Sequence, residues 1–162
     1  MSTTRPDLLG IAQRVARGAR DGEEVEAYVA RARETEVKVH DANVESLVVA
    51  ERAGVGVRVV VDGRQGFAWA GSLDDEVVHD ALAEARDNAE FATPDEFVAI
   101  VTPGDAVGAV PALDLWRDDV LTTDTATKVD LALAAETATL ASDPLVRAVE
   151  SSSYGDTATE AA

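Results

Sequence analysis

Apolar residues recur every three or four positions between Asp7 and Ala19, with arginines among the polar positions. This spacing places the apolar side chains on one face of a helix. Pro6 lies near the start of the segment, where its missing N–H costs little. Asp21-Gly22 follows the segment and is typical of a helix end. The pattern therefore predicts a first, amphipathic helix.

After Gly22 the hydrophobic period changes to two, which is typical of half-buried strands. Alternating or β-branched residues fill five segments, at 25–30, 36–40, 44–50, 55–61 and 64–70. Ala53-Gly54 is expected to break the chain between two of them, and Asp62-Gly63 is a strong signal for a two-residue hairpin. Because the turns are short, the pattern predicts a mainly antiparallel sheet of about five strands.

Helical spacing returns from Ser72 to Ala92 and again from about Thr125 to Ala141. On the later helix the predicted apolar stripe contains Val129, Leu133, Glu136 and Leu140, and the polar Glu136 weakens it. Residues 93–124 contain several prolines and glycines with little periodicity, which favours an extended linker. Residues 145–150 could form one more strand, and the tail from Ser151 carries no packing signal.

The element order predicts an α+β fold in which two helices pack on one face of the sheet, followed by a linker and a further helix. The expected organisation is an N-terminal α+β domain at 1–92, an extended linker at 93–124, and a helix and strand at 125–162.

The chain is strongly acidic, with 31 acidic and 14 basic residues and a formal net charge of −17. Such a charge repels phosphate backbones, so nucleic-acid binding is excluded as the main role. An acid-rich composition with few lysines and aromatic residues favours adaptation to high salt, where counterions screen the self-repulsion. An ordinary acidic protein is the alternative.

No apolar run approaches the roughly 20 residues that span a bilayer, and the N-terminus lacks the apolar core of a secretory signal. The expected location is therefore cytoplasmic, without a membrane partner. The absence of cysteine excludes disulfides and thiolate metal ligands.

The sequence predicts no catalytic, cofactor-binding or metal-binding residues. His40 and His79 are the only histidines and lack the spacing that places two rings on one helical face. Gly54 and Gly56 lack the third glycine of a phosphate loop and precede a strand, so a bulge or a close backbone approach explains them better. The acidic run from Asp74 to Glu76 is explained by the dipole of the helix that it begins.

Three side chains are candidates for structural or interface roles. Arg58 interrupts a run of valines and either holds a carboxylate or faces solvent on an open sheet face. A structural or interdomain pairing is favoured over peptide binding. Phe67 and Trp69 share a strand face, where core packing under the helices is expected, whereas an exposed pair would mark an interface.

Three segments in this order resemble the N-terminal domain of the TldD/PmbA family, also described as modulators of DNA gyrase. The first is Val37–Ser46, a strand followed by a Val-Glu-Ser motif. The second is Gly54–Ala68, with a G-x-G-x-R strand, a D-G turn that ends in Gly63, and a G-F-A strand that begins at Gly66. The third, Asp143–Tyr154, is similar to the segment that leads into the family's central domain, which this chain lacks.

The resemblance implies the N-terminal, non-catalytic domain of a TldD/TldE-type metallopeptidase that acts on unfolded or extended peptides. It also implies a homologous partner subunit and a structural and subunit-contact role for this domain. Zinc is expected only in the TldD-type subunit, and the run from Val59 to Arg64 favours the TldE/PmbA side. The alternative is a free-standing peptide-binding or dimerisation module without enzymatic activity. A third interpretation is a regulatory protein without an enzymatic partner.

The charge leads to a test of salt dependence. We expect the thermal midpoint of the chain to rise as potassium chloride increases toward molar concentrations, because counterions screen the repulsion among the acidic side chains. Thermal melts at low and high salt measure this, and a flat or falling midpoint would contradict the adaptation to high salt.

Overall fold

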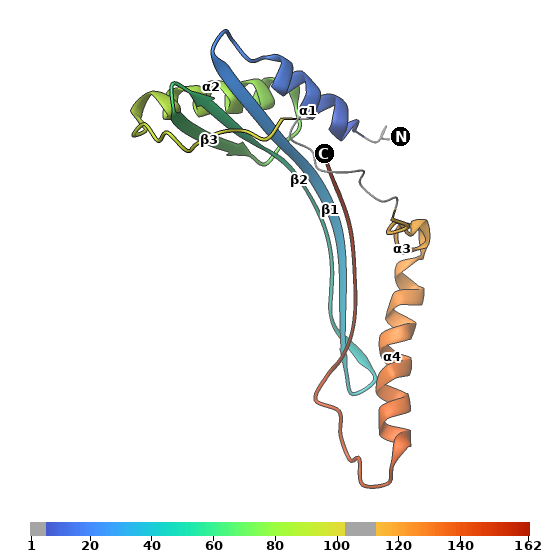
Figure 1. Ribbon diagram of the computed structural model, residues 1–162. Coiled ribbons are helices and arrows are strands. Elements are labelled where there is room, and N and C mark those ends of the chain that lie inside the picture. Colours follow the sequence, from blue (N-terminus) through green and yellow to red (C-terminus); the bar gives the residue numbers. More distant parts are fainter. Residues whose placement is uncertain (1–5, 103–112) are drawn as a thin grey trace. The chain divides into compact units, whose positions relative to one another are not determined.

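The computed structural model describes residues 6–102 and 113–162, which form two compact units (Figure 1). The first unit comprises the described residues of Met1–Arg31, Arg52–Ala112 and Glu160–Ala162. The second comprises the described residues of Ala32–Glu51 and Leu113–Thr159. Both units take residues from separate stretches of the chain. The predicted roles of 93–124 as a linker and of 125–162 as a lead into a further domain remain predictions.

The fold is α+β with a single sheet of four strands in the order β3-β2-β1-β4. The strands are β1 (Glu23–His40), β2 (Asn43–Val61), β3 (Arg64–Ala70) and β4 (Ser152–Ala161). The helices are α1 (Leu8–Arg17), α2 (Asp75–Phe91), the short α3 (Asp118–Thr122) and α4 (Thr125–Ser142). The class, the antiparallel β2–β3 pairing and the three predicted helices are as expected, and the strand count differs.

Two predicted breaks between strands are absent. The segments 25–30 and 36–40 belong to the one strand β1, and 44–50 and 55–61 belong to the one strand β2. Thr35 lies between the first two segments and is buried against polar partners, which interrupts the apolar pattern without ending the strand. Gly54 stays extended, and a Cβ there would lie 2.7 Å from the carbonyl oxygen of Ala70, so this glycine marks a close approach.

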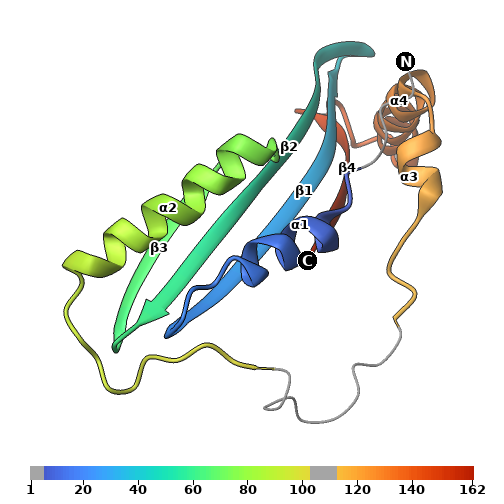
Figure 2. The same ribbon diagram turned by 90° about the horizontal axis from the view of Figure 1, so that it is seen from above.

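In the first unit, α1 and α2 pack on one face of the sheet (Figure 2). The core joins the apolar face of each helix to alternate residues of the strands, among them Val29, Val55, Val57, Val59 and Ala68. A Cβ at Gly66 would lie 1.9 Å from the carbonyl oxygen of Ala85 in α2. The helix therefore lies directly on the strand, and a larger residue at position 66 would push the two apart.

The predicted Asp62-Gly63 hairpin is confirmed. Asp62 and Gly63 have φ angles of 49° and 69°, the left-handed conformation that a type I′ turn requires. The turn pairs Val61 with Arg64 and carries the register along to Arg58 opposite Phe67. The carbonyl oxygen of Gly63 also accepts a hydrogen bond of 2.7 Å from the backbone N–H of Asp95.

In the second unit, the buried face of α4 differs from the predicted stripe. Lys128, Ala132 and Glu136 are buried, whereas Leu140 is exposed. Glu136 faces inward because its two carboxylate oxygens accept hydrogen bonds from the backbone N–H groups of Asp41 and Ala42, at 2.8 and 2.9 Å. Those two residues form the β1–β2 turn and both have positive φ. The glutamate therefore anchors the helix to the hairpin.

The strand suggested at residues 145–150 is wrong, and the strand lies further on in β4. The side chain of Asp143 accepts a hydrogen bond from the N–H of Leu145, forming a turn after the helix. The tail that showed no packing signal alternates between half-buried and exposed residues as a strand does. Its small Ser, Thr and Ala side chains give little hydrophobic contrast. No helix in the described residues is long and apolar enough to cross a membrane.

The hairpin geometry leads to a stability prediction. We expect Gly63→Val to lower the free energy of unfolding by roughly 1–3 kcal/mol, because a β-branched residue is strained at positive φ. The new Cβ would also approach the carbonyl oxygen of Asp95 at 3.2 Å. Denaturant melts measure the change.

The control is Ala53→Ser, at an exposed position of β2, which should change the free energy of unfolding by less than about 0.5 kcal/mol. An unchanged midpoint for Gly63→Val would show that the turn conformation does not constrain the hairpin.

Candidate functional site

The face of the first unit's sheet that points away from α1 and α2 carries exposed aromatic side chains. In β3, Gly66 and Ala68 are buried toward α2, so alternation along the strand turns Phe67 and Trp69 to the other side. Phe67 is 55% exposed and Trp69 is 72% exposed. The expectation that they pack in the core is wrong, and the alternative of an exposed pair holds.

Tyr28 of β1 extends this aromatic surface. Its neighbour Val29 is fully buried in the core, and Tyr28, on the opposite side of the strand, is 61% exposed. Together Glu26, Tyr28, Arg58, Phe67 and Trp69 define what we call the open face. The sequence analysis missed Tyr28, although the alternation of Val25, Ala27 and Val29 around it would have placed it outside the core.

Arg58 lies in the middle of the open face. Its Nε donates to Oε2 of Glu26 at 2.8 Å, and its Nη1 donates to Oε1 of Gln65 at 3.3 Å. Both alternatives raised for this arginine apply in part, since it holds a carboxylate and lies on an open sheet face. The pair is partly exposed, so it contributes at most about 1 kcal/mol to stability. Its main effect is to fix the guanidinium beside the aromatic rings.

The candidate glycines position this surface. A Cβ at Gly56 would lie 3.3 Å from the ring of Phe67, so the absence of a side chain lets the ring lie over the strand. Gly54 allows the close approach to Ala70 described above, Gly63 forms the hairpin turn, and Gly66 admits α2 on the opposite side. The structure thus brings all seven predicted structural or interface residues into the β2–β3 hairpin.

No group of three histidine, cysteine or acidic side chains in residues 6–102 and 113–162 is placed to hold a metal ion. His40 and His79 are both exposed, and His79 lies 3.8 Å from the carboxylate of Asp80. In the acidic run at the start of α2, Asp75 pairs with Arg14 at 3.0 Å. These side chains form surface pairs, and the described surface is suited to binding rather than to bond chemistry.

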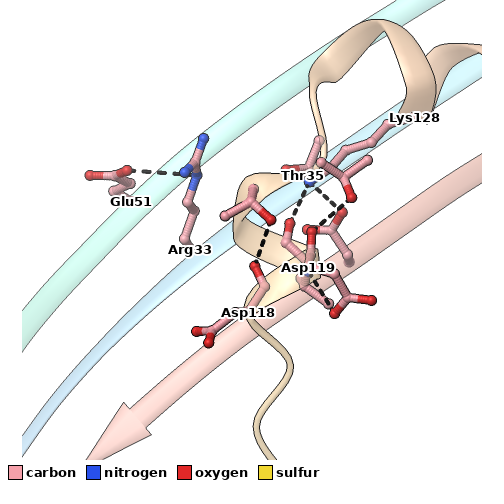
Figure 3. Close-up of polar contacts among 10 residues, drawn as sticks. Arg33, Thr35, Glu51, Asp118, Asp119 and Lys128 are labelled. Atoms are coloured by element: carbon pink, nitrogen blue, oxygen red, sulfur yellow. Dashed lines mark hydrogen bonds and ion pairs between the residues drawn. The ribbon is translucent and has the colours of Figure 1, made fainter.

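The second unit holds a buried charged pair that the sequence analysis missed. Nζ of Lys128 lies 2.7 Å from Oδ2 of Asp156, and both side chains are almost fully buried. The same amine also donates to the hydroxyl of Thr35 and to the carbonyl oxygen of Val120, as Figure 3 shows for the contacts around Lys128. Helix α4, strand β1 and the end of α3 therefore meet at one ammonium group.

Asp156 keeps its charge despite burial. Burial by itself would raise the pKa of Asp156, but hydrogen bonds from Lys128, Tyr154 and Thr35 outweigh it and hold that pKa below its usual value. The hydrogen bond to Asp156, together with burial and the nearby negative charges, raises the pKa of Tyr154. The cluster is satisfied by its own members, which indicates a structural role in the second unit.

Comparison with known proteins identifies the fold and the first domain. The family model described as PmbA/TldA metallopeptidase domain 1 matches residues 25–89. An uncharacterized protein of Methanocaldococcus jannaschii is 32% identical over 82 residues, which is 49% of this chain and 20% of that protein. The predicted relationship to the TldD/PmbA family is confirmed.

Solved structures share the same fold. The chain superposes on TldE from Thermococcus kodakarensis with a TM-score of 0.77 and 21% identity, over 93% of this chain and 34% of that one. A protein of Bacteroides thetaiotaomicron described as a candidate modulator of DNA gyrase gives a TM-score of 0.78 and 22% identity, over 94% and 35%. A Thermotoga maritima protein with a similar description gives 0.74 and 18%, over 94% and 34%. The chain thus spans about a third of the length of each solved relative.

The buried pair leads to a third prediction. Lys128→Met should lower the free energy of unfolding by about 3–5 kcal/mol, because it leaves the buried Asp156 carboxylate without its cation. The matched control is Lys38→Met, which breaks an exposed pair with Glu45 of the same 2.7 Å length and should cost less than about 1 kcal/mol. Urea melts compare the two.

The pH dependence gives an independent readout of the same pair. The pKa of Asp156 is lowered on folding, so its stabilising effect is complete above the unfolded pKa and is lost as the pH falls through the folded value. The acid-induced loss of stability in the wild type should be smaller in Asp156→Asn. Equal costs for the two lysine variants, or identical acid titrations, would show that the buried pair does not stabilise the unit.

Proposed function

We propose that this chain is the N-terminal, non-catalytic domain of a TldD/TldE-type metallopeptidase system that acts on unfolded or extended peptides. Its role is structural and includes contact with a homologous subunit. In that assembly, zinc belongs to the TldD-type subunit and this chain stands on the TldE/PmbA side. The proposed location is the cytoplasm, with neither nucleic acid nor membrane as a partner.

The observation that carries the proposal is the open face. Tyr28, Phe67 and Trp69 are each more than half exposed on one side of a sheet whose other side is covered by helices. Aromatic side chains with an arginine among them are the residues most enriched in protein–protein contacts. The backbone of β2 and β3 is already paired within the sheet, so a partner would bind this face through side chains. A folded subunit surface fits that requirement better than a flexible peptide.

The acidic surface also supports a protein partner rather than a polyanion. A net charge of −17 makes association with phosphate backbones unfavourable, whereas a subunit that offers basic or apolar side chains can approach. The alternative, a free-standing peptide-binding or dimerisation module, predicts that the chain binds a peptide or a second copy but no homologous subunit.

The test is binding of the chain to a TldD-type subunit encoded in the same genome. We expect the two proteins to co-elute in size-exclusion chromatography, and the double variant Phe67→Ala/Trp69→Ala to weaken binding at least about tenfold, since exposed aromatic residues dominate contact energies. The control variant is Phe91→Ala, which removes an aromatic side chain that is 88% exposed at the end of α2, away from the open face.

Fluorescence separates direct contact from an indirect loss of binding. In a Trp116→Phe background, Trp69 is the only tryptophan, and its emission should shift to shorter wavelength when the subunit covers it. Absence of co-elution, or equal loss in Phe91→Ala, would contradict the subunit-contact role. Self-association without binding to the subunit would favour the dimerisation module.

A further inference from the structure

The second unit leaves one edge of its sheet without a partner. Strand β2 lies between β1 and β3 in the sheet, but β3 pairs only with Val55–Val61 of β2. Within the described residues, the segment Asn43–Glu51 therefore has β1 on one side and no strand on the other (Figure 1). We call this segment the free edge. A row of backbone N–H and C=O groups along it is available for pairing.

The free edge is also apolar and uncovered on both faces. Val44, Leu47, Val48 and Val49 are each more than 40% exposed. Helix α4 does not cover them, because the small core that it forms contains residues of β1 and β4 and none of β2. Natural sheets protect such edges with lysines, prolines or short strands. Asn43–Glu51 contains neither lysine nor proline and is nine residues long.

Hairpin geometry indicates which residues present backbone groups to the edge. A two-residue turn at Asp41 and Ala42 makes His40 and Asn43 a hydrogen-bonded pair. The 2.7 Å ion pair between Lys38 and Glu45 agrees with this register two residues further along. Odd-numbered residues therefore bond to β1. The even-numbered residues Val44, Ser46 and Val48 present their N–H and C=O groups to the outside.

Charge decides between possible occupants. The second unit carries 14 acidic and 5 basic residues, a net charge of −9. A second copy at this edge would bring the same negative charge, and both charged residues of the segment, Glu45 and Glu51, are acidic. A strand with basic side chains gains from both the backbone pairing and the field. An apolar strand without charge would gain from the pairing alone.

We infer that the free edge of β2, Asn43–Glu51, binds an extended peptide of alternating apolar and basic residues, which adds to the sheet as a further strand. Backbone hydrogen bonds supply the affinity, and contacts with Val44 and Val48 on one face and Leu47 and Val49 on the other select apolar side chains. The inference rests on the peptide-handling part of the proposed function. It involves residues different from those of the open face.

The experiment uses the 162-residue chain and a labelled nonapeptide of alternating valine and lysine, followed by fluorescence anisotropy. Val48→Pro removes one outward N–H and should weaken binding at least about tenfold, whereas the matched control Val48→Thr keeps the N–H and should stay within about twofold. Proline at this position of an edge strand leaves the bonds to β1 in place. Circular dichroism and thermal melts of both variants confirm that they fold.

Two further peptides separate strand pairing from simple attraction between opposite charges. A peptide of the same composition with prolines inserted cannot pair as a strand and should bind at least about tenfold more weakly. A peptide with glutamate in place of lysine should also bind more weakly, and the affinity for the lysine peptide should fall as salt screens the charges. Val48→Lys should weaken binding of the lysine peptide, and Val48→Glu should not.

Several outcomes would overturn the inference. If Val48→Pro binds as well as the wild type, the peptide is held by charge alone or at another site. Absence of binding at millimolar peptide would exclude the site. A dimer in light scattering that Val48→Pro abolishes would assign the edge to a second copy. Because Phe67→Ala/Trp69→Ala should leave peptide binding unchanged, failure of this inference can be told from failure of the subunit-contact role.

Discussion

The register of the β2–β3 hairpin is the constraint on which the first unit depends. Positive φ at Asp62 and Gly63 allows a two-residue turn, and that turn pairs Val61 with Arg64. Counting back in twos, Gly66 and Ala68 face α2, and Phe67 and Trp69 face the opposite side. A shift of one residue would bury the aromatic rings under α2, where the 1.9 Å approach of Ala85 to a Cβ at Gly66 leaves no room for them. The core and the open face are therefore two results of one turn.

The second unit is organised by polar anchors rather than by a large apolar core. Its buried apolar cluster contains only Val37, Val39 and Ala132, with three partly buried neighbours. Lys128 and Glu136 lie two helical turns apart on α4 and bind partners on the strands, Asp156 at one level and the backbone of the β1–β2 turn at the other. Such anchors contribute less to stability than apolar packing does, but they fix the position of the helix because each must meet its partner. This explains how α4 can leave β2 uncovered.

Sequence patterns predicted the elements with strong hydrophobic contrast and missed those whose partners are distant. The helices and β3 follow from periodicity, and Asp62-Gly63 determines its turn through local chemistry alone. The continuity of β1 through Thr35 depends on Lys128, 93 residues away, which no local pattern reveals. Strand β4 consists largely of small residues, so alternation gave no signal there. For Phe67 and Trp69 the shared face was predictable. Which face it was depended on the glycine and alanine between them, whose small size matches the alanine-rich face of α2.

The two exposed surfaces of the chain call for different kinds of partner. On the open face the backbone is already paired within the sheet, so recognition must come from side chains and needs a partner with a shaped surface. Along Asn43–Glu51 the backbone itself is available, so recognition needs an extended chain and tolerates many sequences, with apolar contacts and charge as the selective part. A domain that supports a peptidase would need both properties, one to join a subunit and one to hold a flexible chain. The acidic charge favours basic or apolar partners at both surfaces, and it limits pairing of one free edge with another.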